Sequence, residues 1–316
     1  MSQKVVFMGT PEFAVASLSE LVDQGIDVCA VVTMPDKPAG RGQQINESEV
    51  KIYAKEKGLS ILQPTNLKDE EFLSELKKLN ADLFVVVAFR MLPEVVWEMP
   101  QLGTINLHGS LLPQYRGAAP INWAVINGDA ETGATTFFIE KEIDTGKIID
   151  SVKIKINEND DAGIVHDRLM VDGSKLLAKT VLSIFNGTAV GQNQLSNSTS
   201  LELKSAPKIF KPDCKIDWKN STTIIYNKIR GLAPYPTAWT EIEKDGIKKS
   251  IKLFKTKKEI DSTNHHLQIQ LKDGSLFFGC NDGWLEIIEL QLEGKKRMQA
   301  NEFLKGFSIT EWKLIN

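Results

Sequence analysis

The N-terminal half of this sequence alternates short apolar runs with stretches of helical periodicity. The runs include Val5–Met8, Val28–Thr33 and Leu83–Ala88. Runs that are apolar along their whole length are typical of strands buried on both faces of a sheet. Since strands that alternate with helices usually pair in parallel, the pattern predicts an α/β, Rossmann-like domain with a mostly parallel sheet and helices on both faces.

The same reading extends along the chain. Further strands and a helix are expected at 103–108, 134–139 and 161–185. Residues 187–205 are rich in Asn, Gln, Ser, Thr and Gly, with few apolar side chains to bury, which is typical of a linker. We therefore predict an N-terminal domain of residues 1–186, a linker of residues 187–205 and a C-terminal domain of residues 206–316.

The C-terminal domain has a different pattern, in which short alternating segments follow turn signals. These segments lie at 215–218, 238–242, 249–254, 267–271, 275–278 and 284–290. Such spacing favours a small β-barrel or sandwich, and we expect a smaller, OB-like β-barrel.

Charge also divides the chain. Of 38 Lys and Arg and 41 Asp and Glu residues, positions 1–204 carry 19 basic and 27 acidic, a balance of −8. Positions 205–316 carry 19 basic and 14 acidic, a balance of +5. Clustered Lys and Arg bind phosphate backbones by releasing counterions, so the C-terminal part is a candidate for binding a polyanion.

Several classes are disfavoured by composition. The longest apolar run, Leu83–Phe89, has seven residues, against the roughly 20 that a membrane-spanning helix needs, and the N-terminus lacks a signal-peptide pattern. Cys29, Cys214 and Cys280 form no CxxC pair, which argues against a disulfide framework and a cysteine zinc site. We expect a cytoplasmic protein.

Nucleotide-binding signatures are weak. The first strand is followed by Gly9-Thr10-Pro11, which lacks the G-x-G-x-x-G run, and the sequence contains no Walker glycine-lysine loop. These features disfavour nicotinamide and nucleoside-triphosphate binding. The long loop from Thr33 to Val50 carries Lys37 and Arg41 among small residues, and loops of this length are often functional.

Polar side chains lie at the end of the strand predicted at 103–108. Asn106 and His108 are two residues apart, so both point to the same face of the sheet. Ligands bind at the carboxyl edge of an α/β sheet. A separate Asp-Thr-Gly turn at Asp144–Gly146 supplies a carboxylate, and together these groups favour a catalytic site over a structural role for the histidine.

The run from Asn106 to Gly117, Asn-Leu-His-Gly-Ser-Leu-Leu-Pro-Gln-Tyr-Arg-Gly, resembles the signature of the folate-dependent formyltransferases. Sites of that family use an Asn, a His and an Asp, which here are Asn106, His108 and Asp144. The resemblance runs essentially end to end, through Phe7–Phe13, Pro35–Gly42, Arg116–Trp123 and Gln291–Met298. The second and fourth of these stretches favour members of the family that formylate methionine carried by initiator tRNA.

The resemblance implies transfer of a formyl group from 10-formyltetrahydrofolate to the α-amine of methionyl initiator tRNA, which supplies formylmethionyl-tRNA for translation initiation. The attacking amine must lose a proton, and we expect His108 to accept it. Asn106 is expected to donate to the developing oxyanion, a contact worth roughly 3 kcal/mol in the transition state. Asp144 is expected to orient the imidazole and favour its protonated form.

Candidate binding residues follow from the same resemblance and from residue type. A pterin ring prefers apolar cover, and the expected folate-binding residues are Phe89, Met91, Leu92, Ser110, Leu111, Leu112 and Pro113. Ser110 is expected to form hydrogen bonds in the pocket and not to act as a nucleophile. The expected tRNA-binding residues are Lys37, Arg41, Lys208, Arg230, Lys295, Lys296 and Arg297, with Lys204 and Lys211 as further members of a basic track.

No metal is expected, because His166, His265 and His266 lack the spacing of metal ligands. The partners expected are the tRNA and the folate co-substrate, with no membrane, and the protein is expected to act as a monomer. One departure from the family pattern follows the basic loop. There the stretch Ile45–Val50 replaces an expected Pro-Ser-Pro-Val-like stretch, and Glu47 and Glu49 make this side less basic.

The same features bear on alternative functions. A formyltransferase for sugar-nucleotide amines shares the three site residues but does not need the basic loop or the basic C-terminal part. A glycinamide ribonucleotide formyltransferase should end near the first domain boundary. A nucleotide-binding oxidoreductase is disfavoured by the missing glycine motif, and a nonenzymatic RNA-binding module by Asn106, His108 and Asp144.

Overall fold

The structure is a computed structural model that describes residues 3–39, 44–194 and 202–316. The chain forms two compact units, and each is described by itself. Unit 1 contains residues 1–117, 133–154 and 167–205, and unit 2 contains residues 118–132, 155–166 and 206–316. The domain limits predicted from the sequence stay a prediction.

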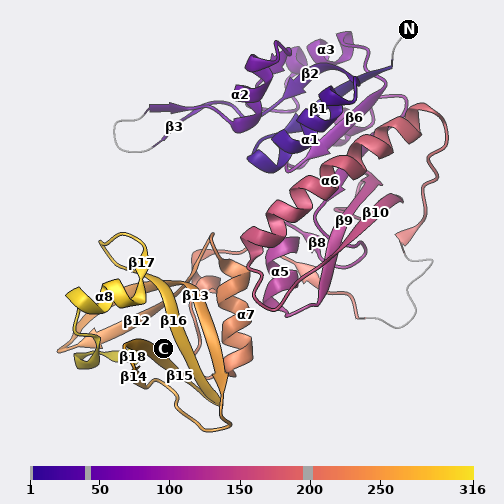
Figure 1. The fold of residues 1–316 in the computed structure, drawn as a ribbon. Helices are drawn as coiled ribbons and strands as arrows, with labels where there is room; N and C mark the ends of the chain where they lie inside the picture. The colour runs from indigo at the N-terminus through magenta and orange to yellow at the C-terminus, as the bar shows by residue number, and fades with distance from the viewer. Residues whose placement is uncertain (1–2, 40–43, 195–201) are drawn as a thin grey trace. The chain divides into compact units, whose positions relative to one another are not determined.

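Unit 1 is built on one twisted sheet (Figure 1) with the strand order β10-β9-β7-β6-β1-β2-β5. Its strands are β1 (Lys4–Gly9), β2 (Asp27–Val32), β5 (Ile61–Leu62), β6 (Leu83–Val87), β7 (Thr104–His108), β9 (Glu131–Phe138) and β10 (Ile148–Lys155). Five of them, from β5 to β7, pair in parallel, and β9 pairs antiparallel with β7. The predicted mostly parallel sheet is confirmed.

Helices cover both faces of this sheet. They are α1 (Glu12–Asp23), α2 (Glu49–Glu56), α3 (Glu70–Lys78), α4 (Glu94–Trp97) and α6 (Ala162–Phe185). Alternation along the strands decides which face each side chain meets. Met8 and Val86 share a buried cluster with Phe72 of α3. On the opposite face, Gly173 of α6 lies so close to Leu107 that an added Cβ would stand 3.3 Å from it.

The loop between β2 and α2 contains a short hairpin. Strand β3 (Lys37–Ala39) pairs antiparallel with β4 (Gln44–Asn46), and Lys37 lies opposite Asn46. Ser48 caps α2 by accepting a hydrogen bond from the Lys51 backbone N–H at 3.1 Å, and its hydroxyl lies 2.8 Å from that of Thr33. The stretch that departs from the family pattern therefore encodes the start of a helix.

Unit 2 contains a curled antiparallel half-barrel (Figure 1) with the strand path β14-β15-β16-β13-β12-β18, and β17 pairs with β16. The strands are β12 (Ala238–Lys244), β13 (Ile247–Ile260), β14 (Ile269–Lys272), β15 (Ser275–Cys280), β16 (Gly283–Leu292), β17 (Met298–Gln299) and β18 (Lys313–Ile315). Its helices are α5 (Pro120–Ile126), α7 (Thr222–Leu232), α8 (Ala300–Gly306), η2 (Lys211–Cys214) and η3 (Ile309–Glu311). Unit 1 also contains β8 (Arg116–Gly117), which pairs with the two-residue strand β11 (Ser205–Ala206), where the residues of that unit end.

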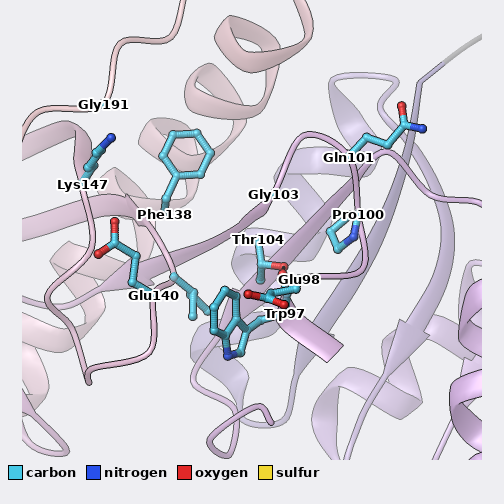
Figure 2. Close-up of a pocket in the computed structure, with 11 residues that line it drawn as sticks. Trp97, Glu98, Pro100, Gln101, Gly103, Thr104, Phe138, Glu140, Lys147 and Gly191 are labelled. Carbon is cyan, nitrogen blue, oxygen red and sulfur yellow. Dashed lines mark hydrogen bonds between the residues drawn. The ribbon is translucent and has the colours of Figure 1, made fainter. Parts of the chain in front are cut away.

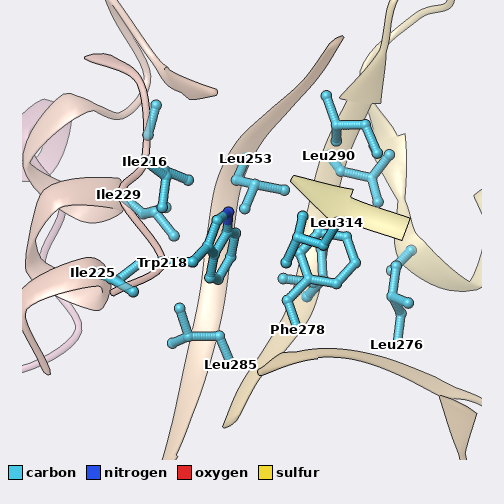
Figure 3. Packing of buried hydrophobic residues seen from close by; sticks show 14 of the residues in the cluster. Ile216, Trp218, Ile225, Ile229, Leu253, Leu276, Phe278, Leu285, Leu290 and Leu314 are labelled. Carbon is cyan, nitrogen blue, oxygen red and sulfur yellow. The ribbon is translucent and has the colours of Figure 1, made fainter. Parts of the chain in front are cut away.

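Trp218 is the largest fully buried side chain of the unit 2 core, shown in Figure 3. It stacks edge-on against Phe278 with ring centroids 5.6 Å apart, and its indole N–H donates to the Thr240 hydroxyl at 2.8 Å. The hydrogen bond satisfies the one polar atom of the indole, which would otherwise be buried without a partner. Among the described residues, no helix is long and apolar enough to cross a membrane.

Candidate functional site

The candidate site lies at the carboxyl edge of the unit 1 sheet, where β6 and β7 end side by side. Val86 of β6 is paired with Asn106 of β7, so the segment that follows β6 lies next to His108. Asn106 is half-buried, and His108 is 6% exposed. The strand alternation therefore places both side chains on one face, as the sequence predicts.

Both ring nitrogens of His108 face oxygen atoms. Nε2 lies 2.8 Å from the backbone carbonyl oxygen of Tyr115, and Nδ1 lies 3.8 Å from Oδ2 of Asp144. A carbonyl oxygen only accepts hydrogen bonds, so Nε2 carries the proton of the neutral ring. Nδ1 is then the nitrogen that is free to take up a proton, and the Asp144 carboxylate lies beside it.

Asp144 is held in an uncommon backbone conformation. Its φ is +56°, in the left-handed region that aspartate adopts in turns more readily than most residues. Its Oδ2 accepts a hydrogen bond from the Gly117 backbone N–H at 2.9 Å. The same turn is also constrained at Gly146, because a Cβ there would stand 1.7 Å from the carbonyl oxygen of Phe138. The turn therefore requires glycine at this position.

The loop after β7 folds back over the sheet and is fastened by buried hydroxyl groups. The fully buried Ser110 donates from Oγ to the carbonyl oxygen of Gln114 at 2.6 Å. Thr135 on β9 donates to the Ser110 carbonyl at 2.7 Å and accepts from the Leu112 N–H at 3.2 Å. The Ser110 hydroxyl thus holds the loop itself, and Thr135 is a supporting residue that the sequence reading missed.

The predicted folate-binding residues are distributed over the two neighbouring loops. Phe89, Met91 and Leu92 follow β6, with Leu92 buried at 8% exposure and Met91 exposed at 72%. Leu111, Leu112 and Pro113 follow β7, and Leu111 packs on Gly133, where an added Cβ would meet it at 2.4 Å. An exposed apolar side chain beside the half-buried Phe89 fits a flat heteroaromatic ring.

Gln194 brings the segment after α6 to this site, which the sequence reading did not predict. Its side chain is buried at 5% exposure. Its Nε2 donates to the carbonyl oxygens of Asp144 and Gly146, and its Oε1 accepts from the Arg116 guanidinium. The polar composition of residues 187–194 gave no signal for this burial, because tertiary hydrogen bonds alone decide it.

A cleft lies elsewhere in unit 1 (Figure 2). It measures about 620 Å³ and is lined by Trp97, Glu98, Gln101, Thr104, Phe138, Glu140 and Lys147, among others. Thr104 begins β7, whereas Asn106 and His108 lie at the end of the same strand. Because the cleft is at the opposite edge of the sheet, we do not include it in the candidate site.

The predicted tRNA-binding residues differ widely in exposure. Lys37, Lys208, Lys295 and Lys296 are exposed, as are Lys204 and Lys211, the further members of the basic track. Arg297 forms a two-point ion pair with Glu289 and lies 4.2 Å over the Phe254 ring. Arg41 lies outside the described residues.

Arg230 has an internal environment. It is 9% exposed, donates from Nη1 to the Asp160 carbonyl at 2.9 Å, and donates from Nε to Asn227 at 2.8 Å. Burial lowers the pKa of its guanidinium. A side chain with these contacts braces α7 against the turn before α6, so we leave Arg230 out of the tRNA surface proposed below.

Charged residues also fasten the root of the β3–β4 hairpin. Lys51 Nζ lies 2.5 Å from Asp36 and 3.0 Å from Glu47. Gln63 donates to Asp36 at 2.9 Å and to the Met34 carbonyl at 2.8 Å. We call Asp36, Glu47, Lys51 and Gln63 the root clamp.

These hydrogen bonds shift the pKa values of three members of the root clamp. Hydrogen bonds from Lys51 and Gln63 hold the pKa of the Asp36 carboxyl below its ordinary value, and hydrogen bonds from Lys55 and Lys51 do the same for the pKa of Glu47. The pKa of Lys51 is raised in return. Over the described part of the chain, no cluster of three or more His, Cys, Asp or Glu side chains is placed to hold a metal ion.

Comparison with known proteins agrees with this fold and shows the family. The family profile described as formyl transferase matches residues 3–181, and that of the formyl transferase C-terminal domain matches residues 208–308. The fold and site therefore define a formyl transferase. Curated relatives narrow the assignment. The chain is 50% identical to the methionyl-tRNA formyltransferase of Bacteroides thetaiotaomicron, over 99% of this chain and 98% of the relative.

A second relative is equally similar. The methionyl-tRNA formyltransferase of Parabacteroides distasonis is 52% identical, over 96% of this chain and 95% of the relative. Identity at this level over nearly the whole length of both proteins decides the family. The chain belongs to the methionyl-tRNA formyltransferase family.

Solved structures share the fold at low sequence identity. The sugar 3N-formyl transferase WlaRD, solved with dTDP and 5-N-formyl-THF, has a TM-score of 0.65 and 20% identity, covering 94% of this chain and all of that one. HypX from Aquifex aeolicus, in complex with tetrahydrofolic acid, has a TM-score of 0.63 and 17% identity, covering all of this chain and 51% of that one. At these identities the likeness concerns the fold alone.

Proposed function

We propose that this protein transfers a formyl group from 10-formyltetrahydrofolate to the α-amine of methionyl initiator tRNA. The observation that carries the proposal is the convergence of His108, Asp144 and Asn106 at the carboxyl edge of the sheet, in a chain of this family. Such a protein would work where translation begins, which we expect to be the cytoplasm, and it would act as a monomer on its tRNA.

His108 is the proposed proton acceptor. As the amine nitrogen bonds to the formyl carbon and the bond from that carbon to N10 breaks, one proton must leave the amine and one must reach N10. With Nε2 engaged by the Tyr115 carbonyl, Nδ1 takes the first proton. Asp144, 3.8 Å away, stabilises the imidazolium that results. The same proton can then pass to the leaving nitrogen, so the residue is restored.

Asn106 is the proposed oxyanion donor. The formyl oxygen gains negative charge as the amine attacks, and an amide N–H aimed at it stabilises the transition state more than the ground state. Asn106 lies on the same strand face as His108, two residues away. The folate would supply the activated formyl group, held between the loops that carry Phe89, Met91 and Leu92 and those that carry Leu111, Leu112 and Pro113.

The tRNA is proposed to contact exposed lysines in both units. Lys37 lies on β3 of unit 1, and Lys208, Lys295 and Lys296 belong to unit 2, with Lys204 and Lys211 as further members of the track. Arg297 adds a partly exposed guanidinium. Backbone phosphates bind such side chains without sequence preference.

A competition between amine acceptors tests this proposal. The purified protein is given 10-formyltetrahydrofolate together with methionyl initiator tRNA, and in parallel with an amino-sugar nucleotide. Formylmethionyl-tRNA as the main product supports the proposal. Formylation of the sugar alone would refute the tRNA substrate while leaving the roles of Asn106, His108 and Asp144 in place.

A further inference from the structure

Gln194 joins two loops of the candidate site through a single buried amide. Its Nε2 donates to the Asp144 carbonyl at 2.9 Å and to the Gly146 carbonyl at 2.8 Å. Its Oε1 accepts from Arg116 Nε at 3.0 Å and Nη2 at 2.5 Å. Both hydrogens of the amide are used, and its oxygen has two donors, at 5% exposure.

The arrangement fixes the orientation of the amide. Arg116 has donors only, so Oε1 must face the guanidinium and the NH2 group must face the two carbonyls. Arg116 itself follows the loop that carries Ser110 and Tyr115, and its neighbour Gly117 donates to Oδ2 of Asp144. Gln194 therefore ties the backbone of the Asp144–Gly146 turn to the same segment that binds the Asp144 carboxylate.

The hydrogen bonds from Gln194 hold the Asp144 turn. Asp144 has a left-handed φ of +56°, a conformation that aspartate tolerates in turns. The two hydrogen bonds reach the carbonyl of Asp144 itself and the carbonyl two residues later, so they fix the backbone of the turn. If the turn relaxed, the carboxylate would move away from Nδ1 of His108.

We propose that Gln194 is a positioning residue, whose amide holds the Asp144–Gly146 turn so that the Asp144 carboxylate faces His108. This inference rests on the proposed function, because it assigns Gln194 its importance through the roles of Asp144 and His108. It gives the polar segment after α6 a part in the reaction, although Gln194 itself touches neither substrate nor the imidazole.

Replacement of the amide by an apolar side chain of similar length tests the proposal. Gln194→Met should lower kcat on the order of 10- to 100-fold, because small displacements of a catalytic group are costly, while KM for both substrates stays within about threefold. Gln194→Glu keeps an acceptor for Arg116 but loses both donors. Its kcat should therefore be no higher than that of Gln194→Met. Gln192→Met is the matched control, since the Gln192 side chain is exposed and its backbone pairs with Ile148.

A spectroscopic readout separates positioning from mere stability. The imidazole ¹⁵N resonances of His108, assigned with a His108→Gln sample, should shift in Gln194→Met in the direction seen in Asp144→Asn. Binding of tetrahydrofolate and the thermal midpoint report whether each variant is folded. A kcat within about twofold of wild type, or a loss that equals the loss of folded protein with unmoved His108 resonances, would overturn the proposal.

The wild-type protein alone tests the proposed function. If that function is wrong, the wild type leaves methionyl-tRNA unformylated. If the wild type formylates the amino-sugar nucleotide instead, the same Gln194 variants are measured with that acceptor, and the same outcomes decide whether the amide positions Asp144.

Discussion

His108 has two neighbours of different kinds, and the difference decides which nitrogen can accept a proton. The Tyr115 carbonyl can only accept, which commits Nε2 to donation and leaves Nδ1 beside the Asp144 carboxylate. A main-chain group thus sets the tautomer, and in the proposed mechanism the Asp144 side chain stabilises the charge. Both partners come from loops outside β7, so the strand alone does not define the function of its histidine.

His108→Ala should abolish formyl transfer, because it removes the proposed proton acceptor. The ring is buried and packs edge-on against Phe137, so the thermal midpoint should fall, and folate binding shows that the variant is folded. Single-turnover assays across pH give the measurement. His265→Ala, which removes an imidazole from unit 2, should retain full activity. Near-normal transfer by His108→Ala would discard the proposed mechanism.

Asn106 should behave differently from a binding residue. Asn106→Ala is expected to lower kcat on the order of 100-fold, the loss typical of one oxyanion donor, with a smaller change in KM. The measurement is steady-state kinetics with each substrate varied in turn. An increase in KM at unchanged kcat would mean that Asn106 binds substrate and does not stabilise the transition state.

At this scale, the sequence predicted the residues whose signal is local. Asn106 and His108 share a strand face because of their spacing, and the turn at Asp144–Gly146 is marked by its glycine. Gln194 and Thr135 have no such signal, because a buried polar side chain is defined by the partners that the folded chain brings to it. The resemblance to a family named the candidate residues, and the structure supplied the contacts that surround them.

At the scale of elements, the root clamp replaces the proline-rich stretch expected after the basic loop. Prolines would stiffen that stretch through their fixed φ. Here Glu47 pairs with Lys51, Lys55 also contacts Glu47, and Ser48 caps α2. A hairpin that carries Lys37 is therefore fastened at its root by charges and a helix cap.

Lys51 is the member of the root clamp that contacts both carboxylates. Lys51→Met leaves Asp36 and Glu47 without their shared partner, so the hairpin should lose its fixed root. We expect kcat/KM for methionyl-tRNA to fall about tenfold, with folate binding unchanged. Lys57→Met, the same change at an exposed position at the end of α2, is the control. Weakened folate binding in Lys51→Met would instead assign the hairpin to the folate site.

The clamp should also respond to pH in a defined direction. The pKa values of Asp36 and Glu47 are lowered from 3.8 and 4.5, so their pairing stabilises the fold above those values and is lost as pH falls through the lowered ones. The raised pKa of Lys51 keeps the pairing intact at alkaline pH up to its ordinary value of 10.5.

A double-mutant cycle of Asp36→Asn and Lys51→Met measures this response. The coupling in unfolding free energy should be constant between about pH 5 and about pH 9 and should vanish on further acidification. A coupling that is unchanged in strong acid would show that the two side chains interact by packing and not by charge.

Strand prediction succeeded for the uniformly apolar runs and for five of the six alternating segments of the C-terminal part, and it failed at 215–218. The runs that became β1, β2 and β6 are apolar throughout, whereas the expected strand at 215–218 forms one isolated bridge from Lys215 to Trp239. Its buried members, Ile216 and Trp218, alternate as in a strand, but they pack into the unit 2 core from an extended loop. The helix α7 (Thr222–Leu232) was not predicted from the sequence.

At the scale of the whole molecule, the uneven charge predicts a salt-dependent complex with tRNA. Each lysine that contacts a phosphate adds roughly 1 to the slope of log K against log salt. Lys295→Ala with Lys296→Ala should lower the slope by about 2 and weaken binding for all tRNAs alike. Lys77→Ala with Lys78→Ala removes an equally exposed pair from α3 and should leave the slope unchanged.

The division into units determines how this protein can be truncated or recombined. The backbone leaves unit 1 and returns to it more than once before it remains in unit 2, so residues 118–132 and 155–166 fold with a partner that is synthesised much later. In α5, Asn122 donates to the carbonyl of Gly231 on α7 at 2.8 Å. A fragment that ends at residue 205 would expose to solvent the surfaces of these two segments that pack against residues 206–316. Unit 2 is therefore made of three separate segments of the chain, and exchanging it between relatives requires five junctions instead of one.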